Sequence, residues 1–111
     1  MRRTVEFHAY NLKQGNRDEF HRLVSEVSFP LMLQWSVDII DFGPSLHDEN
    51  SYYLIRAYAS LNERQSSQDA FYGSPDWRQG PREEIVALIE SDTSVVIEME
   101  SAVVNALRKA L

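Results

Sequence analysis

The chain has 111 residues, of which 43% are hydrophobic and 25% are charged, and a net charge of −6, so it is typical of a folded globule and too apolar for a disordered chain. We therefore expect a single domain over residues 1–111. Its acidic balance argues against a nucleic-acid partner, because phosphate backbones are repelled, and the absence of cysteine excludes disulfides and zinc–thiolate sites.

The first part of the chain is predicted to form a strand followed by a helix. Apolar and polar residues alternate from Arg3 to Leu12, which is the period of a strand with two different faces. Asn16 and Glu19 then have the spacing of a helix-capping box, and apolar residues recur after them with helical spacing. Pro30 lacks an N–H group, so it should kink or stop this helix.

The middle of the chain is predicted to form a strand hairpin and a second helix. Residues 37–42 and 51–60 have strand character, and the polar segment 47–50 between them predicts a hairpin turn. Asn62 is then expected to open a helix that ends near Gly73.

The last third is predicted to add short helices around a final strand. Ser74–Pro75 has a capping residue followed by proline at the first helical position, and residues 85–89 supply the buried edge of the next helix. Asp92–Thr93 is expected to turn the chain into a strand over residues 94–100. Ser101 then caps an amphipathic helix. The apolar side of that helix is predicted to carry Val103, Leu107, Ala110 and Leu111.

This order, βαββαβ with a C-terminal helix, predicts an α+β fold of the ferredoxin-like class. In that fold the first strand lies between the fourth and the third, and all neighbouring strands are antiparallel. One face of the sheet is then uniformly apolar, and we expect the helices to cover it. Its members are Val5, Phe7, Ala9, Ile55, Ala57, Val95, Ile97 and Met99.

The opposite face mixes aromatic and charged side chains. Its members are Glu6, His8, Tyr10, Leu54, Arg56, Tyr58, Val96, Glu98 and Glu100. We expect the sheet of a second copy to cover this face, which would hide the aromatic rings and let Arg56 pair with Glu6 or Glu98. A face simply exposed to solvent, with cross-strand ion pairs, is the competing interpretation.

Four titratable side chains are candidate acid–base groups for catalysis, namely His8, His21, Glu6 and Glu98. Glu6 and Glu98 lie on adjacent predicted strands, and His21 lies beside the apolar stripe of the first helix. Purely structural histidines and an interface ion-pair network are the competing explanations. The histidine spacing contains no metal-binding motif, so no metal site is predicted.

Aromatic residues and one arginine form the predicted ligand-binding set, which suits a small apolar or aromatic ligand. Its members are Tyr10, Trp35, Tyr53, Arg56, Tyr58 and Trp77. Core packing of the same rings is the competing explanation.

Three segments of the chain carry a family resemblance. Residues 6–10 (Glu-Phe-His-Ala-Tyr) are similar to Glu-Leu-Arg-x-Tyr, the opening strand of the NIPSNAP family, with His8 in place of arginine. Residues 58–64 (Tyr-Ala-Ser-Leu-Asn-Glu-Arg) are similar to its Tyr-x-Ser-x-x-Glu-Arg segment, and Phe71 with residues 74–77 is similar to Phe-x-x-x-Pro-x-Trp. The resemblance implies a dimeric α+β barrel, the architecture shared with antibiotic-biosynthesis-type monooxygenases, and it implies no particular reaction.

Residues and resemblance together predict a NIPSNAP-like homodimer of unassigned biochemical role, which binds a small apolar or aromatic ligand between its helices and sheet. The alternative is a cofactor-independent monooxygenase or isomerase in which His21 or His8 acts on protons, and a third reading is a protein-interaction module. A pocket lined by Trp35 and Trp77 with a histidine reaching into it would favour the enzyme. No cofactor is predicted, although related barrels that bind heme leave heme as a further candidate.

The chain also lacks the marks of export and membrane insertion. No apolar h-region follows the N-terminal arginines, and no apolar run approaches the length of a membrane span. We therefore expect a cytoplasmic protein with no membrane partner.

Overall fold

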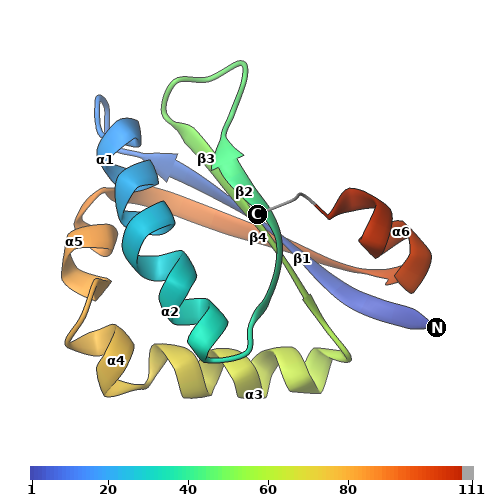
Figure 1. Ribbon diagram of the computed structural model, residues 1–111. Helices are drawn as coiled ribbons and strands as arrows, with labels where there is room; N and C mark the ends of the chain where they lie inside the picture. Colours follow the sequence, from blue (N-terminus) through green and yellow to red (C-terminus); the bar gives the residue numbers. More distant parts are fainter. Residues whose placement is uncertain (109–111) are drawn as a thin grey trace.

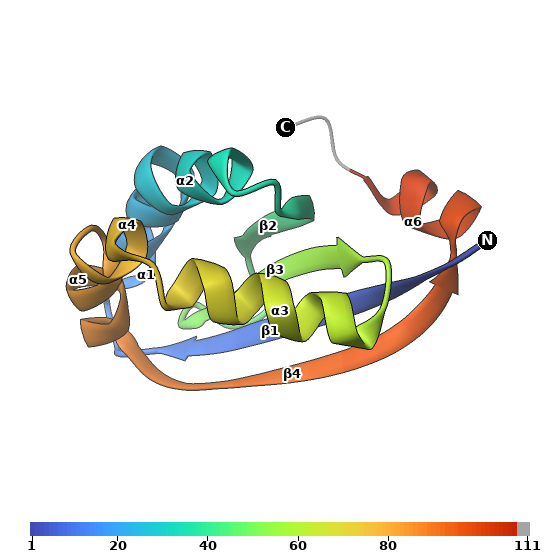
Figure 2. The ribbon, with the colours of Figure 1, turned by 90° about the horizontal axis from the view of Figure 1, so that it is seen from below.

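Four strands form one antiparallel sheet in the computed structural model, which describes residues 1–108 (Figure 1). The strands are β1 (Arg2–Leu12), β2 (Asp38–Pro44), β3 (Ser51–Tyr58) and β4 (Ile89–Glu100). Their order across the sheet is β2-β3-β1-β4, so the predicted ferredoxin-like arrangement is confirmed. Figure 2 shows β2 and β4 at the two edges, with β1 and β3 between them.

Helices cover one face of this sheet, and a single short helix lies at the other face (Figure 1). The covering layer consists of α1 (Arg17–Leu23), the π-helical turn η1 (Val24–Ser28), α2 (Phe29–Gln34), α3 (Leu61–Tyr72), α4 (Pro75–Arg78) and α5 (Arg82–Ala87). Helix α6 (Ser101–Leu107) follows β4 and packs Val104 against Val5, Ile40 and Ala57 on the opposite face.

The predicted break at Pro30 takes the form of a π-helical turn. Pro30 stands in the first turn of α2, where a missing N–H group matters least. The preceding residue, Phe29, donates its N–H to the carbonyl of Val24, five residues back. The helix therefore passes through η1 and continues. Asn16 precedes α1 as expected, but its side chain donates to the Lys13 carbonyl, so the capping box does not form.

Two of the helix starts are set by serine caps. Ser60 Oγ accepts a hydrogen bond from the Glu63 N–H, so Ser60 is the N-cap and α3 begins at Leu61. The predicted opening residue, Asn62, lies two residues after this cap. Ser74 Oγ accepts from the Trp77 N–H, which confirms the predicted cap of α4.

The C-terminal part departs from the prediction in three places. Ile89 does not lie on the edge of a helix, because α5 ends at Ala87 and Ile89 begins β4. Asp92–Thr93 is not a turn, because both residues lie inside β4 and pair with Tyr10 and Ala9 of β1. Glu100, not Ser101, is the N-cap of α6, and Ser101 Oγ instead donates to the Met1 carbonyl. Val104 is the buried residue of that helix. Val103 and Leu107 are 46% and 43% exposed, and the predicted apolar residues Ala110 and Leu111 lie outside the described residues.

The assignment of the two sheet faces was reversed. Glu6 and Arg56 lie beneath the helices, with 0% and 1% of their surface exposed, whereas Val95 and Ile97 on the other face are 59% and 43% exposed. The charged face is buried because helix α3 contributes polar side chains that complete the hydrogen bonding of Glu6. The uniformly apolar face is left largely uncovered, apart from the patch beneath α6. None of the helices in residues 1–108 is long and apolar enough to cross a membrane.

Candidate functional site

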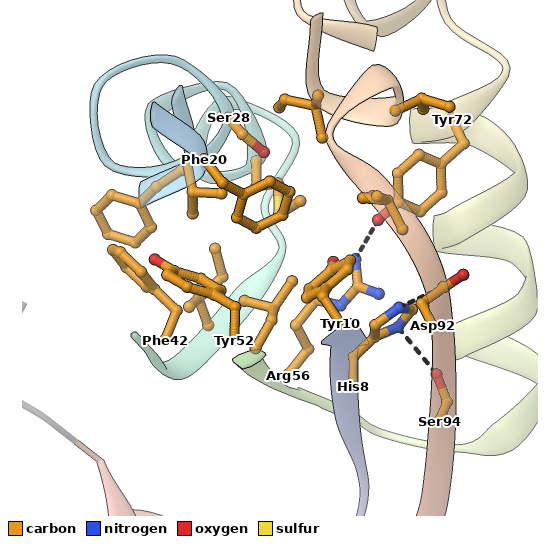
Figure 3. A pocket seen from close by; sticks show the side chains of 18 of the residues that line it. His8, Tyr10, Phe20, Ser28, Phe42, Tyr52, Arg56, Tyr72, Asp92 and Ser94 are labelled. Carbon is orange, nitrogen blue, oxygen red and sulfur yellow. Dashed lines mark hydrogen bonds and ion pairs between the residues drawn. The ribbon is translucent and has the colours of Figure 1, made fainter. Parts of the chain in front are cut away.

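A cavity of about 480 Å³ lies between the covering helices and the sheet (Figure 3). Its size is in the range of pockets that bind small molecules. Most of its wall is aromatic or aliphatic and comes from both layers. The apolar lining includes Phe20, Val24, Phe29, Met32, Ile39, Phe42, Leu54, Trp77, Ile85 and Ile89.

One end of the cavity is built on a buried cluster of charges. Arg56 of β3 donates from Nε to Glu6 Oε1 at 2.9 Å, and Arg64 and Gln68 of α3 donate to Glu6 Oε2 at 2.7 Å each. Arg56 also donates from Nη1 to the Tyr72 hydroxyl at 2.7 Å. The position follows from register, because Glu6 pairs directly with Arg56 across β1 and β3. The cluster thus ties α3 to the sheet floor.

The carboxyl of Glu6 is held in its ionised form. Burial alone opposes ionisation, but the charge of Arg56 and the hydrogen bonds from Gln68, Arg56 and Arg64 outweigh it, so the pKa of Glu6 lies below its ordinary value. A buried carboxylate with this many donors is an anchor for its neighbours and a poor proton acceptor.

His8 reaches into the same end of the cavity and is held on both ring nitrogens. Its Nε2 lies 2.7 Å from Asp92 Oδ2, and its Nδ1 lies 2.9 Å from Ser94 Oγ. A carboxylate only accepts, so Nε2 carries the proton and Nδ1 accepts from the Ser94 hydroxyl. Burial lowers the pKa of His8, although the hydrogen bond to Asp92 opposes that effect. The imidazole is therefore neutral at neutral pH, with the tautomer set by Asp92.

Two hydroxyl groups in the cavity are not engaged by the described part of the chain. Tyr10 packs its ring on His8, with centroids 4.4 Å apart, and no hydrogen bond joins its hydroxyl to any group in residues 1–108. Burial raises the pKa of Tyr10, so its hydroxyl is a proton donor at neutral pH. Ser28, placed in the wall by the π-helical turn, is likewise without a side-chain hydrogen bond there.

Of the ten candidate residues predicted from the sequence, the structure gathers some at this cavity. His8, Tyr10, Arg56 and Trp77 line it. Glu6 lies directly behind Arg56.

The other five candidates lie elsewhere. Tyr58 is buried next to Gln68, whose amide donates to its hydroxyl at 3.3 Å. His21 is exposed on α1 and lies 2.6 Å from the Tyr52 hydroxyl. Trp35 is 37% exposed and donates to Asp76, and Tyr53 donates to Asp41 on the open face. Glu98 pairs with Arg2 at the surface.

Several residues that line the cavity were not predicted from the sequence. Asp92 was assigned to a turn, and no residue of the helix predicted to end near Gly73 was among the candidates. A usable signal was present, because Arg64, Gln68 and Tyr72 recur every four residues and so share one face of α3. Among residues 1–108, no group of three or more His, Asp or Glu side chains has the arrangement of a metal site.

Comparison with known proteins places the fold. No protein-family model and no curated protein sequence matches the chain. A NIPSNAP family protein from Agrobacterium tumefaciens superposes with a TM-score of 0.80 at 19% identity, covering 89% of this chain and 87% of that one. An uncharacterized NIPSNAP domain protein from Burkholderia xenovorans gives 0.78 at 19% identity, covering 88% and 95%.

A more distant likeness extends to the monooxygenase type of the same architecture. A candidate antibiotic biosynthesis monooxygenase from Bordetella bronchiseptica superposes with a TM-score of 0.65 at 13% identity, covering 91% of this chain and 98% of that one. The chain therefore has a NIPSNAP-like α+β fold, as the resemblance of its three sequence segments implied.

Proposed function

We propose that this protein is a NIPSNAP-like homodimer whose cavity between helices and sheet binds a small apolar or aromatic ligand. The observation that carries the proposal is the cavity of about 480 Å³, walled mostly by rings and aliphatic side chains, with Arg56, His8 and Asp92 together at one end (Figure 3). Such a combination favours ligands that bury an apolar body and are oriented by a few hydrogen bonds.

The homodimer rests on the open face of the sheet. Val95 and Ile97 of β4 are 59% and 43% exposed, and Phe7 and Ile55 beside them are only partly buried. A contiguous apolar sheet face in contact with water is unfavourable, and the sheet of a second copy is the cover that matches it. We therefore retain the sheet-to-sheet packing expected from the sequence, but assign it to the opposite face of the sheet.

The ligand proposal is tested with cinnamamide, a neutral aromatic probe, followed by chemical-shift changes in NMR. We expect the probe to shift resonances of residues that line the cavity. Val86 lines the rim and is 45% exposed, so Val86→Trp should narrow the entrance without disturbing the core and weaken binding at least about tenfold. Val27, which is 38% exposed and outside the cavity, supplies the control Val27→Trp. No shift on addition of either cinnamamide or its anionic counterpart cinnamate, or equal weakening by the two variants, would refute the proposal.

A second candidate function, the cofactor-independent enzyme, is supported by one specific observation. His8 lines the cavity as a neutral imidazole oriented by Asp92. Its basic nitrogen, Nδ1, accepts from the Ser94 hydroxyl, so a general-base role would take a proton from the ligand through Ser94. The criterion set from the sequence is met only in part, because Trp77 lines the cavity and Trp35 does not. The ligand-binding function remains the primary proposal.

A further inference from the structure

The polar end of the cavity has a composition that selects among apolar ligands. We infer that the ligand is a monoanion, with an apolar or aromatic body and one acidic oxygen group, such as a carboxylate, bound beside Arg56, Tyr72 and Tyr10. This inference rests on the proposed ligand-binding function and specifies the chemical class of its ligand.

The first argument is a count of hydrogen-bond donors. Arg56 carries five N–H groups. Three of them, one each on Nε, Nη1 and Nη2, bond Glu6 and Tyr72, so two remain. Tyr72 accepts from Arg56 through its oxygen, so its own proton is available for another partner. Tyr10 has a protonated hydroxyl that bonds no group in residues 1–108. This end of the cavity therefore offers donors and calls for a ligand that accepts.

The second argument is the balance of charge. Arg56 and Arg64 carry two positive charges onto Glu6, which carries one negative charge, so this three-residue cluster by itself has a net charge of +1. The negative charges of Asp92 and Glu90 lie on the other side, towards β4. The side chains of Arg56 and Arg64 are only 2% and 19% exposed, so water screens the positive charge of the cluster poorly. One anionic group on a ligand would neutralise it.

The nearby acidic side chains limit the ligand to one negative charge. Asp92 lies on the β4 side of the same end, where it is hydrogen-bonded to His8, and Glu90 is exposed at the rim. Since His8 is neutral, these two carboxylates repel a second anionic group placed towards β4.

The spatial arrangement separates the two parts of such a ligand. Arg56, Tyr72 and Tyr10 gather on one side of the cavity, while the rings of Phe42 and Tyr52 stand at the other side (Figure 3). A ligand with its acidic oxygen at Arg56 would place its apolar body towards those rings (Figure 3).

The test compares cinnamate with cinnamamide, which differ in charge and hardly in shape. By isothermal titration calorimetry, we expect the wild-type protein to bind cinnamate about tenfold or more tightly than cinnamamide. Tyr72→Phe and Arg64→Met should each remove most of this preference, because they weaken cinnamate binding more than cinnamamide binding. Tyr53→Phe, on the open face, is the matched control and should keep the preference. Circular dichroism confirms that each variant is folded, and if Arg64→Met fails to fold, Tyr72→Phe decides.

The outcomes separate this inference from the proposed function. If cinnamamide binds in the cavity but cinnamate binds no more tightly, the monoanion inference is wrong and the ligand-binding function stands. If cinnamate is preferred but Tyr72→Phe and Arg64→Met keep the preference, the anionic group is bound elsewhere and the inference is again wrong. If neither compound binds, both proposals fall.

Discussion

Arg56 and Glu6 form an ion pair inside a single chain, with Arg56 Nε 2.9 Å from Glu6 Oε1 and both side chains enclosed beneath helix α3. The second oxygen of Glu6 accepts from Arg64 and Gln68 of that helix. Each partner therefore joins strand to strand and sheet to helix at once. The polar end of the cavity takes its shape from this pair, so the stability of the fold and the proposed site depend on the same contacts.

Removing Arg56 should be strongly destabilising. Arg56→Ala would leave the Glu6 carboxylate buried with only part of its neutralising charge, and breaking a buried pair in this way typically costs about 3–5 kcal/mol. We expect a loss of that size in the free energy of unfolding measured by urea denaturation.

The matched control is an arginine that pairs at the surface. Arg22 bonds Glu19 and Glu26 along α1 and η1 with its side chain 47% exposed, so Arg22→Ala should lower the free energy of unfolding far less than Arg56→Ala does. Similar losses for the two variants would mean that the buried pair contributes little more than a surface one.

The strand order could be predicted from the sequence, but the choice of sheet face could not. Period-two alternation correctly divides the strand residues into two sets, because side chains on a strand must alternate. Which set faces the helices depends on partners far away in sequence. Glu6 and Arg56 appear suited to solvent until Arg64 and Gln68 are known to lie above them. A burial rule based on single residues therefore assigns the wrong face.

The lining of the cavity could not be predicted in full from the sequence, for a related reason. We expected a ligand site between helices and sheet, and His8, Tyr10, Arg56 and Trp77 were named as candidates. The first three, however, were assigned to the sheet face that points away from the helices. Asp92 was not predicted as a lining residue, because its sequence suggested a turn, whereas it pairs with Tyr10 in the edge strand β4. Turn propensity is a local preference, and eleven paired positions along β1 outweigh it.

Acidification should destabilise the fold first through His8. The pKa of His8 in the folded state lies below its ordinary value of 6.5 because the ring is buried, although Asp92 opposes that effect. As pH falls below about 6.5, the unfolded chain takes up a proton that the folded chain resists, so stability must decrease with falling pH. We expect thermal melting to move down between about pH 7 and pH 5.5, and His8→Gln to flatten this slope.

The control for that experiment is His47, which is exposed in the β2–β3 turn, so His47→Gln should keep the wild-type slope. A second loss should begin below about pH 4.5, because the unfolded chain then protonates carboxyls whose pKa is lowered in the folded chain, Glu6 and Asp38 among them. A melting temperature that stays constant down to about pH 5 in the wild-type protein would contradict the role given to His8.

The open sheet face makes a prediction about assembly that separates folding from association. Val95 is 59% exposed in one chain, so Val95→Glu should hardly change the fold, but in a sheet-to-sheet dimer it would bury an unpaired charge. We expect the wild-type protein to sediment as a dimer, and Val95→Glu to raise the dimer dissociation constant at least about a hundredfold with little change in monomer circular dichroism. Leu33→Glu on α2, where Leu33 is 52% exposed, is the control and should stay dimeric. If Leu33→Glu dissociates the dimer and Val95→Glu does not, the helical side forms the interface, and the apolar face of the sheet must be explained by another partner.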